Sequence, residues 1–182
     1  MTVSSDVWFT LLVAAVGVER IIELVISQRH ISFSKSRGGV EFGRSHYPAM
    51  VVLHLGLLVG AVLEVWLLDR IFYPWLGWPM LAVVIAAQAL RWLCIATLGW
   101  QWSTRVVVVP DAPRVSGGPY RWSSHPNYVA VVAEGLALPL VHTAWITAGV
   151  FSIANAFVLR TRLRVEREAL NLLAPTSSRS IQ

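Results

Sequence analysis

The chain has 182 residues and a formal net charge of +5; 55% of its residues are hydrophobic and only 14% are charged. Soluble domains carry about 25% charged residues, so this composition excludes an ordinary soluble domain and indicates a membrane protein with several spans. The single cysteine, Cys94, excludes an intrachain disulfide and a cysteine metal cluster, and we expect no metal site. The length fits one domain over residues 1–173, followed by a polar tail over residues 174–182 that we expect to be disordered.

Apolar runs long enough to cross a bilayer recur along the chain, since a span needs about 20 apolar residues. The first three predicted spans cover residues 7–26, 47–68 and 72–98. No basic region precedes the first run, so we expect it to remain as a span and not to be removed as a signal peptide.

The last apolar run, residues 128–159, is too long for one untilted span, and Pro139 lies near its middle. We therefore predict a helical hairpin with arms at residues 128–138 and 143–159. The predicted fold is an all-α integral membrane bundle of about five transmembrane helices, with a C-terminal helix that leaves the membrane.

The basic residues predict how this bundle is oriented. Of the 15 Lys and Arg residues, 12 fall within residues 27–46, 99–127 and 160–182. Five spans place these segments on one side, which the positive-inside rule makes cytoplasmic, whereas four would separate the last from the others. We predict an inner-membrane protein whose N-terminus lies outside and whose C-terminus lies in the cytoplasm. The basic residues in these segments can also bind the head groups of anionic lipids, so we expect membrane lipids as partners and no nucleic acid.

A polar, turn-rich segment over residues 117–128 is wedged between the apolar runs. Polar backbone at membrane depth must be satisfied internally or line a cavity. Gly118 favours a tight turn, and Pro126 suits the first turn of the following helix. His125 and Tyr128 are three residues apart and share a helix face. These residues indicate either a binding site or a helix start with an interfacial tyrosine.

Two further segments accompany it on the predicted cytoplasmic side. Residues 105–110 are rich in β-branched valine and end at a proline, so we expect extended backbone there. In the C-terminal helix, Arg162 and Glu166 are four residues apart and can pair on one face. That pair fits a functional site, but it also fits a solvated helix with alternating charges.

Three motifs in this order resemble one known family. They are Gly118-Pro119-Tyr120-Arg121, His125-Pro126-x-Tyr128 and Arg162-Leu163-x-x-Glu166. The set is similar to the isoprenylcysteine carboxyl methyltransferase superfamily, integral-membrane enzymes that use S-adenosylmethionine and release S-adenosylhomocysteine. The resemblance covers about residues 100–172. Residues 39–54 also resemble a narrower bacterial branch, the alkylpyrone methyltransferases associated with type III polyketide synthases.

The resemblance implies that residues 100–173 form a cytoplasmic cofactor-binding half. The residues it implies as cofactor contacts are Val109, Gly118, Tyr120, Arg121, His125, Pro126, Tyr128 and Glu166. A carboxylate and aromatic faces suit the cationic sulfonium and ammonium groups of the cofactor. Arginine or turn amides suit its carboxylate. Arg162 and Glu166 are implied as the catalytic pair, with Arg162 orienting an anionic nucleophile.

The acceptor that the resemblance implies is a lipophilic molecule from the bilayer. Both an alkylpyrone-like enol and an isoprenylcysteine carboxylate fit, and the narrower resemblance favours the enol, with a polyketide synthase as its source. Both acceptors ionise readily, so methyl transfer to oxygen requires mainly positioning. This agrees with the absence of an obvious nucleophile–base pair in the sequence.

Ionisable residues within apolar runs usually face the bundle interior and are often functional. Glu134 either pairs with Arg91 across helices or lines the substrate cavity, and Arg91 either pairs or reaches toward the cytoplasmic surface. His54 is an interior histidine, and Glu64 is expected to be solvated or paired with Arg70.

Three of these polar residues, His46, His54 and Glu134, are candidates for substrate binding. Near the end of the first run, Glu19, Arg20 and Glu23 form a self-neutralising cluster. The residues that could join that cluster at a substrate entrance are Glu41, Arg44 and His46.

A small transporter or channel is the alternative from another functional class, because buried polar residues in spans also fit it. The sequence has neither the internal repeats nor the paired broken helices of such proteins. A transporter also gives no reason for the three ordered motifs. The leading hypothesis is therefore a methyltransferase.

Overall fold

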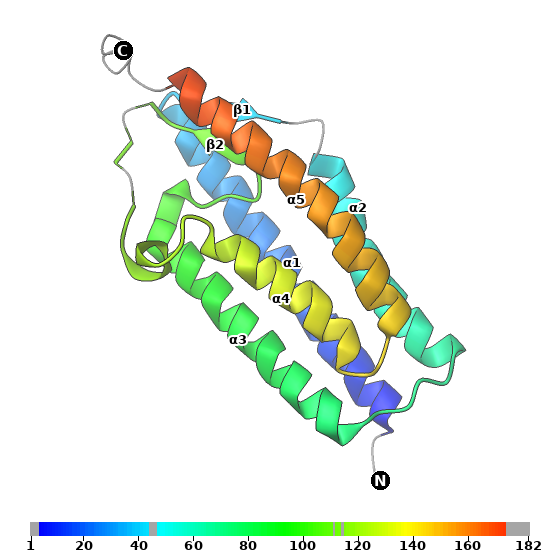
Figure 1. Ribbon diagram of the computed structural model, residues 1–182. Coiled ribbons are helices and arrows are strands. Elements are labelled where there is room, and N and C mark those ends of the chain that lie inside the picture. The colour runs from blue at the N-terminus through cyan, green and yellow to red at the C-terminus, as the bar shows by residue number, and fades with distance from the viewer. Residues whose placement is uncertain (1–3, 44–46, 111, 114, 174–182) are drawn as a thin grey trace.

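The computed structural model describes residues 4–43, 47–110, 112–113 and 115–173, and the side chains of these as far as residue 169. Over those residues, five α-helices form an elongated bundle with a small two-stranded ribbon at one end (Figure 1). The helices and strands are α1 (Ser5–Ser36), β1 (Val40–Phe42), α2 (Tyr47–Leu67), α3 (Pro74–Leu98), β2 (Val106–Val108), α4 (Pro126–Leu140) and α5 (Trp145–Leu173). We call the end with the strands the ribbon end and the opposite end, where α4 turns into α5, the turn end.

The predicted helices are largely confirmed. The hairpin predicted for the last apolar run is present as α4 and α5, and the turn between them includes His142. Two helical stretches, Tyr47–Leu67 and Pro74–Gln101, are long and apolar enough to cross a membrane by length and composition. The all-α prediction misses the ribbon, and the tail over residues 174–182 lies outside the described part of the chain.

The first helix continues ten residues beyond the predicted span, so much of the predicted loop from residue 27 is helical. The buried positions Glu23, Ser27, Ile31 and Ser34 follow the helical period through this stretch. The extension also contacts the segment after α3. The Ser27 and Thr104 hydroxyls lie 2.8 Å apart. The extension is therefore helical because its buried face packs against the ribbon end.

The apolar core lies toward the turn end. Phe9 and Val13 of α1 pack there against Val65 of α2, Val84 of α3 and Leu138 of α4, and all five are at most 4% exposed. Lipid tails are as apolar as these side chains, so in a bilayer such a core is stabilised mainly by van der Waals packing. The tight core fixes the helices at the turn end and leaves the ribbon end to more polar contacts.

Glu64 joins α2 to the start of α5. Its carboxylate accepts hydrogen bonds from the backbone N–H groups of Ile146 and Thr147 at 3.1 and 2.7 Å. The first N–H groups of a helix have no partner within that helix, so this carboxylate satisfies two of them. Arg70 donates to the same carboxylate at 2.7 Å, which confirms the predicted pairing. Glu64 therefore fixes the position at which α5 begins.

A network of charged side chains connects α1, α3 and α4 in the bundle interior. Arg91 contacts Glu134 at 2.5 Å, which confirms that predicted pair. Arg20 lies 3.1 Å from Glu134 and 2.6 Å from Glu23. Because Arg91 is only 5% exposed, the expectation that it reaches toward the surface is wrong. Buried charges need such partners, and here they tie three helices together.

Glu41, one of the residues expected to join this network at an entrance, lies on β1 at the ribbon end. Its carboxylate contacts Lys35 at 2.8 Å and Arg105 at 3.0 Å, and so it holds the ribbon end together. Arg44 and His46, the other two expected companions, lie outside the described residues.

A cavity between the ribbon and helices α3, α4 and α5

The ribbon places the loop that follows β2 over the ends of the helices. Strands β1 and β2 are antiparallel, with Val40 opposite Val108 and Phe42 opposite Val106. This confirms the extended backbone predicted from the run of valines. The guanidinium of Arg105, just before β2, also lies 4.6 Å from the ring centre of Tyr47. The ribbon is therefore held both to α1 and to the start of α2.

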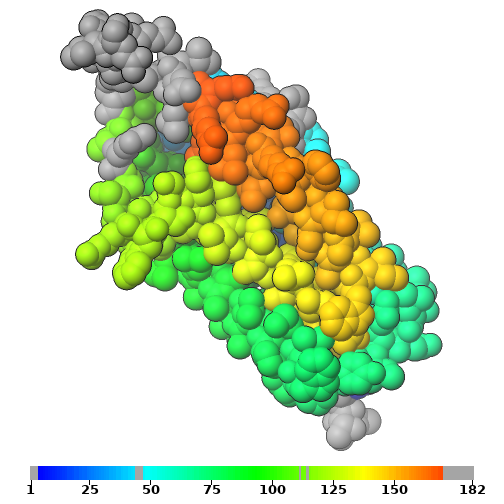
Figure 2. Space-filling model, viewed as in Figure 1, coloured from blue at the N-terminus to red at the C-terminus, as the bar shows by residue number. Residues whose placement is uncertain are grey.

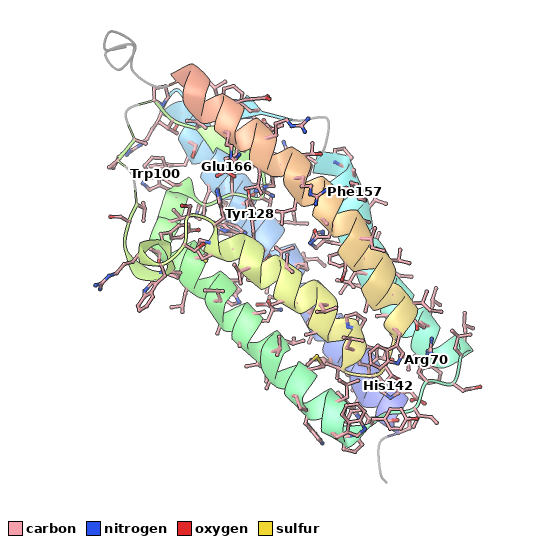
Figure 3. All side chains as sticks on the ribbon, viewed as in Figure 1. Arg70, Trp100, Tyr128, His142, Phe157 and Glu166 are labelled. Atoms are coloured by element: carbon pink, nitrogen blue, oxygen red, sulfur yellow. The ribbon has the colours of Figure 1, made fainter. Side chains whose placement is uncertain are left out.

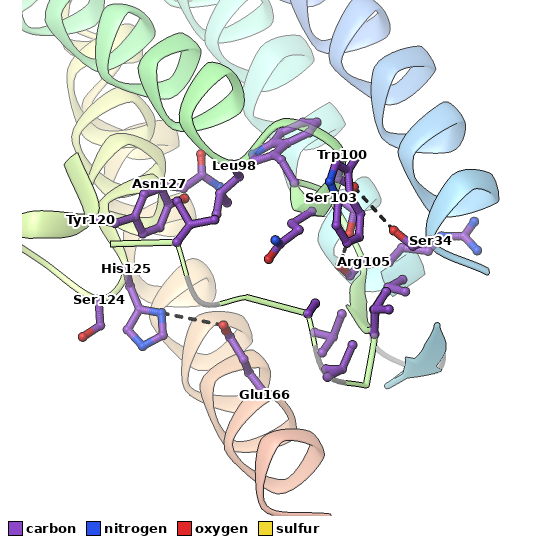
Figure 4. A pocket seen from close by; sticks show the side chains of 18 of the residues that line it. Ser34, Leu98, Trp100, Ser103, Arg105, Tyr120, Ser124, His125, Asn127 and Glu166 are labelled. Carbon is purple, nitrogen blue, oxygen red and sulfur yellow. Dashed lines mark hydrogen bonds and ion pairs between the residues drawn. The ribbon is translucent and has the colours of Figure 1, made fainter. Parts of the chain in front are cut away.

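A cavity of about 290 Å³ lies between this loop and the ends of α3, α4 and α5 (Figure 4). The predicted site residues that line it are Val109, Tyr120, His125, Tyr128, Arg162 and Glu166. They come from the loop after β2, the turn before α4, and the facing sides of α4 and α5. The fold thus brings together residues from all three motifs found in the sequence.

Gly118 is required by the turn that positions Tyr120. Its φ of +53° lies in the left-handed region, and a Cβ atom there would lie 2.6 Å from the Thr97 hydroxyl. The turn thereby packs directly on the end of α3. Burial raises the pKa of the Tyr120 phenol, so this side chain is a neutral hydrogen-bonding group in the cavity wall.

Tyr128 connects α4 to α5 at the edge of the cavity. Its hydroxyl donates to a Glu166 carboxylate oxygen at 2.6 Å and accepts from Arg162 Nε at 3.0 Å. Arg162 and Glu166 therefore meet through this hydroxyl, where a direct pair was predicted. On its other side, the Tyr128 ring stacks on His125 with ring centres 5.1 Å apart. His125 Nδ1 in turn lies 3.9 Å from Glu166.

These groups form one continuous surface of mixed character. It offers two aromatic rings, a carboxylate and a guanidinium. Figure 3 shows Tyr128 and Glu166 near the ribbon end, while Arg70 and His142 lie near the turn end. The candidate site is thus well separated from the apolar core.

Three of the implied cofactor contacts do not line the cavity. Arg121 is exposed, Pro126 is buried at the start of α4, and Gly118 contributes through the turn. Among the candidates for substrate binding, Glu134 belongs to the charged network. The His54 ring bonds the Met50 carbonyl at 2.8 Å and packs edge-on against Phe151. The third candidate, His46, lies outside the residues that the structure describes.

Two residues that line the cavity, Trp102 and Asn127, were not predicted as site residues from the sequence. Trp102 is 3% exposed, and its indole Nε1 is buried with no hydrogen-bond partner among the described residues. The Asn127 amide oxygen is in the same situation within the described chain. Asn127 stands inside the His-Pro-x-Tyr motif, which is a signal that could have identified it. Buried polar groups normally have partners, so these two atoms are unusual in the cavity lining.

Helices that are apolar enough for a bilayer, with a polar cavity at one end, are typical of a membrane protein that binds a polar ligand. The model of the "Isoprenylcysteine carboxyl methyltransferase (ICMT) family" matches residues 80–172. The chain belongs to this family, which is membrane-bound, and membership indicates a methyltransferase that uses S-adenosylmethionine.

Two bacterial proteins are similar to this chain over most of its length. The "Uncharacterized protein YpbQ" of Bacillus subtilis (strain 168) is 38% identical over 165 residues, covering 89% of this chain and 96% of the relative. An "Uncharacterized protein" of Haemophilus influenzae is 24% identical over 159 residues, covering 87% and 92%. No solved structure gives a significant match to the chain.

Proposed function

We propose that the protein is an S-adenosylmethionine-dependent O-methyltransferase that modifies a lipophilic acceptor taken from the bilayer. The observation that carries this proposal is the junction of Tyr128, Arg162 and Glu166 at the edge of the ribbon-end cavity. This junction brings a carboxylate and a guanidinium to one place between two helices. A cationic methyl donor and an anionic acceptor require that combination.

The ribbon-end cavity fits the donor by its chemistry. Glu166 supplies negative charge for a cationic group, and the stacked rings of His125 and Tyr128 supply aromatic faces. The unpartnered Trp102 Nε1 donor and Asn127 oxygen acceptor suit the polar edge of a nucleoside base. When bound, S-adenosylmethionine would supply a methyl group to the acceptor oxygen, and S-adenosylhomocysteine would be released.

Arg162 is suited to hold the acceptor. Its Nε donates to the Tyr128 hydroxyl and its Nη1 lies 3.2 Å from the Met50 sulfur. Its Nη2 makes no hydrogen bond within the described chain, so it is free to bind an oxyanion. An acceptor that is already ionised needs no general base. The contribution of these residues is then to align the oxygen and to exclude water.

The acceptor we favour is an alkylpyrone-like enol, with an isoprenylcysteine carboxylate as the competing choice. The similarity of residues 39–54 to alkylpyrone methyltransferases supports the enol. A polyketide synthase would then supply it. Both acceptors carry a long hydrocarbon chain that partitions into lipid, which agrees with a site at the end of a membrane bundle.

For the topology, we propose five spans in the inner membrane, with the N-terminus outside and the site in the cytoplasm. The end of α1, the ribbon and the end of α5 all lie at the ribbon end (Figure 1), which supports an odd number of crossings. In a Cys94→Ser background, Trp122→Cys should react with a membrane-impermeant thiol reagent only after the cells are opened. Asp69→Cys should react in intact cells, and the reverse pattern would exclude this topology.

Calorimetric titration of the purified protein with S-adenosylhomocysteine tests the cofactor site. We expect binding by the wild type and at least tenfold weaker binding by Glu166→Ala and His125→Ala. Glu168→Ala is the matched control, because Glu168 lies exposed on the same helix two residues further on. Absence of binding by the wild type, or equal binding by Glu166→Ala and Glu168→Ala, would contradict the proposal. Labelled methyl transfer to a 6-alkyl-4-hydroxy-2-pyrone, followed by mass spectrometry, then tests the acceptor.

A further inference from the structure

A second cavity, of about 250 Å³, lies between α4 and α5 on the side of the bundle. The two helices are joined at the turn end and diverge toward the ribbon end (Figure 1). The space-filling view shows the surface hollowed between them (Figure 2). Val132 of α4 lines one side, and residues along one stripe of α5, from Phe151 to Leu163, line the other.

A close helix contact closes this side cavity toward the turn end. Phe151 packs directly on the α4 backbone at Gly135, where an added Cβ atom would lie 1.9 Å from its ring. The same ring packs edge-on against His54 with ring centres 5.4 Å apart. A molecule in the side cavity is therefore stopped in this direction.

Toward the ribbon end, the residues that line the side cavity are neighbours of the Tyr128 junction along α4 and α5. Val132 lies one helical turn after Tyr128 on α4, and Leu163 directly follows Arg162 on α5. Tyr128 and Arg162 themselves line the ribbon-end cavity. The hydrogen-bonded junction thus lies in the wall of a polar cavity, which suits the donor, and close along both helices to a mostly apolar cavity on the side of the bundle.

Asn155 is the exceptional residue in the side cavity. Its side chain lines the cavity and is only 5% exposed, yet it makes no hydrogen bond to any other described residue. Polar side chains within membrane helices normally bond across to a neighbouring helix. The Asn155 carboxamide faces the open cavity and bonds no other described side chain, so it is placed to hydrogen-bond a ligand atom there.

We propose that the side cavity holds the acceptor and that Asn155 hydrogen-bonds a second oxygen of its head group. This inference rests on the proposed function. Asn155 and Arg162 are seven residues apart on α5, a rise of about 10 Å, and both side chains tilt toward the start of the helix. A compact head group covers this distance when a hydrogen bond to each side chain is included, with one oxygen at Arg162 and another toward Asn155, and its alkyl tail continues along the apolar wall.

The arrangement selects between the two classes of acceptor. An oxygen heterocycle with an ionised enol carries further ring or carbonyl oxygens that accept a hydrogen bond from the Asn155 amide. A prenylated cysteine has its amide carbonyl and second carboxylate oxygen next to the reacting oxygen, and the part that extends further along α5 is a thioether sulfur, a weak acceptor, and hydrocarbon. Asn155 is therefore a specificity-determining residue that favours an oxygen-rich head group.

The test compares Asn155→Ala with Asn155→Ser, which are similar in size and differ in one hydroxyl. The probes are a 6-alkyl-4-hydroxy-2-pyrone and N-acetyl-S-farnesylcysteine, with labelled S-adenosylmethionine as donor. We expect Asn155→Ala to raise KM for the pyrone at least tenfold, Asn155→Ser to restore part of the loss, and neither to change KM for the farnesylcysteine. The affinity for S-adenosylhomocysteine should stay at the wild-type value in both variants, as it should in Ile153→Ala on the exposed side of α5.

Equal pyrone KM values in the wild type and Asn155→Ala would overturn the role of Asn155, and so would a parallel loss of S-adenosylhomocysteine affinity. Calorimetric binding of the pyrone to the protein in lipid nanodiscs gives a readout that needs no methyl transfer. If the wild type binds the pyrone more tightly than Asn155→Ala but methylates neither probe, the proposed function fails while the Asn155 site stands.

Discussion

Replacing Tyr128 with phenylalanine separates the two roles that the structure gives to this residue. The ring stacks on His125, while the hydroxyl bonds both Glu166 and Arg162. Phenylalanine keeps the ring and removes both hydrogen bonds. A hydrogen bond to a charged group contributes about 1.5–3 kcal/mol. If one of the two bonds acts mainly in the transition state, kcat/KM should fall about ten- to hundredfold, since about 1.4 kcal/mol corresponds to a factor of ten.

The assay is labelled methyl transfer to a 6-alkyl-4-hydroxy-2-pyrone, combined with calorimetric titration with S-adenosylhomocysteine. Tyr128→Phe should bind this ligand within about threefold of the wild type, whereas Tyr128→Leu, which loses the ring, should bind it much more weakly. The matched control is Tyr73→Phe, the same change at an exposed residue at the start of α3, which should leave both readouts unchanged. A wild-type kcat/KM in Tyr128→Phe would refute the reasoning that the hydroxyl aligns Arg162 and Glu166.

Three further predictions concern the framework of the site. Glu134→Gln removes the negative charge that compensates two buried guanidinium groups and should lower the free energy of unfolding in detergent by about 3 kcal/mol. Glu19→Gln, at a more exposed carboxylate, should lower it less. Equal losses in the two variants would contradict a structural role for the Glu134 ion pairs. Gly118→Ala should weaken S-adenosylhomocysteine binding at least tenfold because of the positive φ and the contact beneath it, whereas Gly117→Ala, with open space around the added carbon, should not. Burial lowers the pKa of His142, so as the pH falls the unfolded chain is protonated at this residue before the folded chain is. The free energy of unfolding should therefore fall below about pH 6.5, by at most about 1.4 kcal/mol per pH unit. His142→Gln should flatten the dependence of the melting temperature on pH between pH 7 and 5, and an unchanged slope would disprove this role.

The sequence contains what is needed to predict the elements but less of what is needed to predict their limits. The β-branched run at residues 106–108 forms a strand because it pairs with Val40–Phe42, which supplies the hydrogen bonds that a lone extended segment lacks. The end of α1 was predicted too early because basic residues such as Arg29 and Lys35 suggested a loop. Both side chains are exposed, while Ser27 and Ile31 are buried at helical spacing, and this spacing is the stronger signal.

The site was predictable as a set of residues but not as an arrangement. Spacing along α5 indicates that Arg162 and Glu166 share a face, and from this a direct pair is the natural expectation. The Tyr128 hydroxyl comes between them because of the angle at which α4 meets α5. That angle depends on distant contacts, namely the Glu64 carboxylate at the start of α5 and the packing of Phe151 on Gly135. No local pattern contains this information.

The positions of the hydrogen bonds and ion pairs between helices indicate where the bundle can open to admit an acceptor. Ion pairs of Glu134 with Arg20 and Arg91 hold α4 to α1 and α3. Among the described side chains, by contrast, the hydrogen bonds that connect α4 directly to α5 all involve Tyr128. Widening the space between these two helices therefore disturbs one junction and no interior ion pair. The group that aligns the reacting partners is thus also the group that an acceptor entering from the lipid side must displace or engage, so binding and alignment depend on the same hydroxyl.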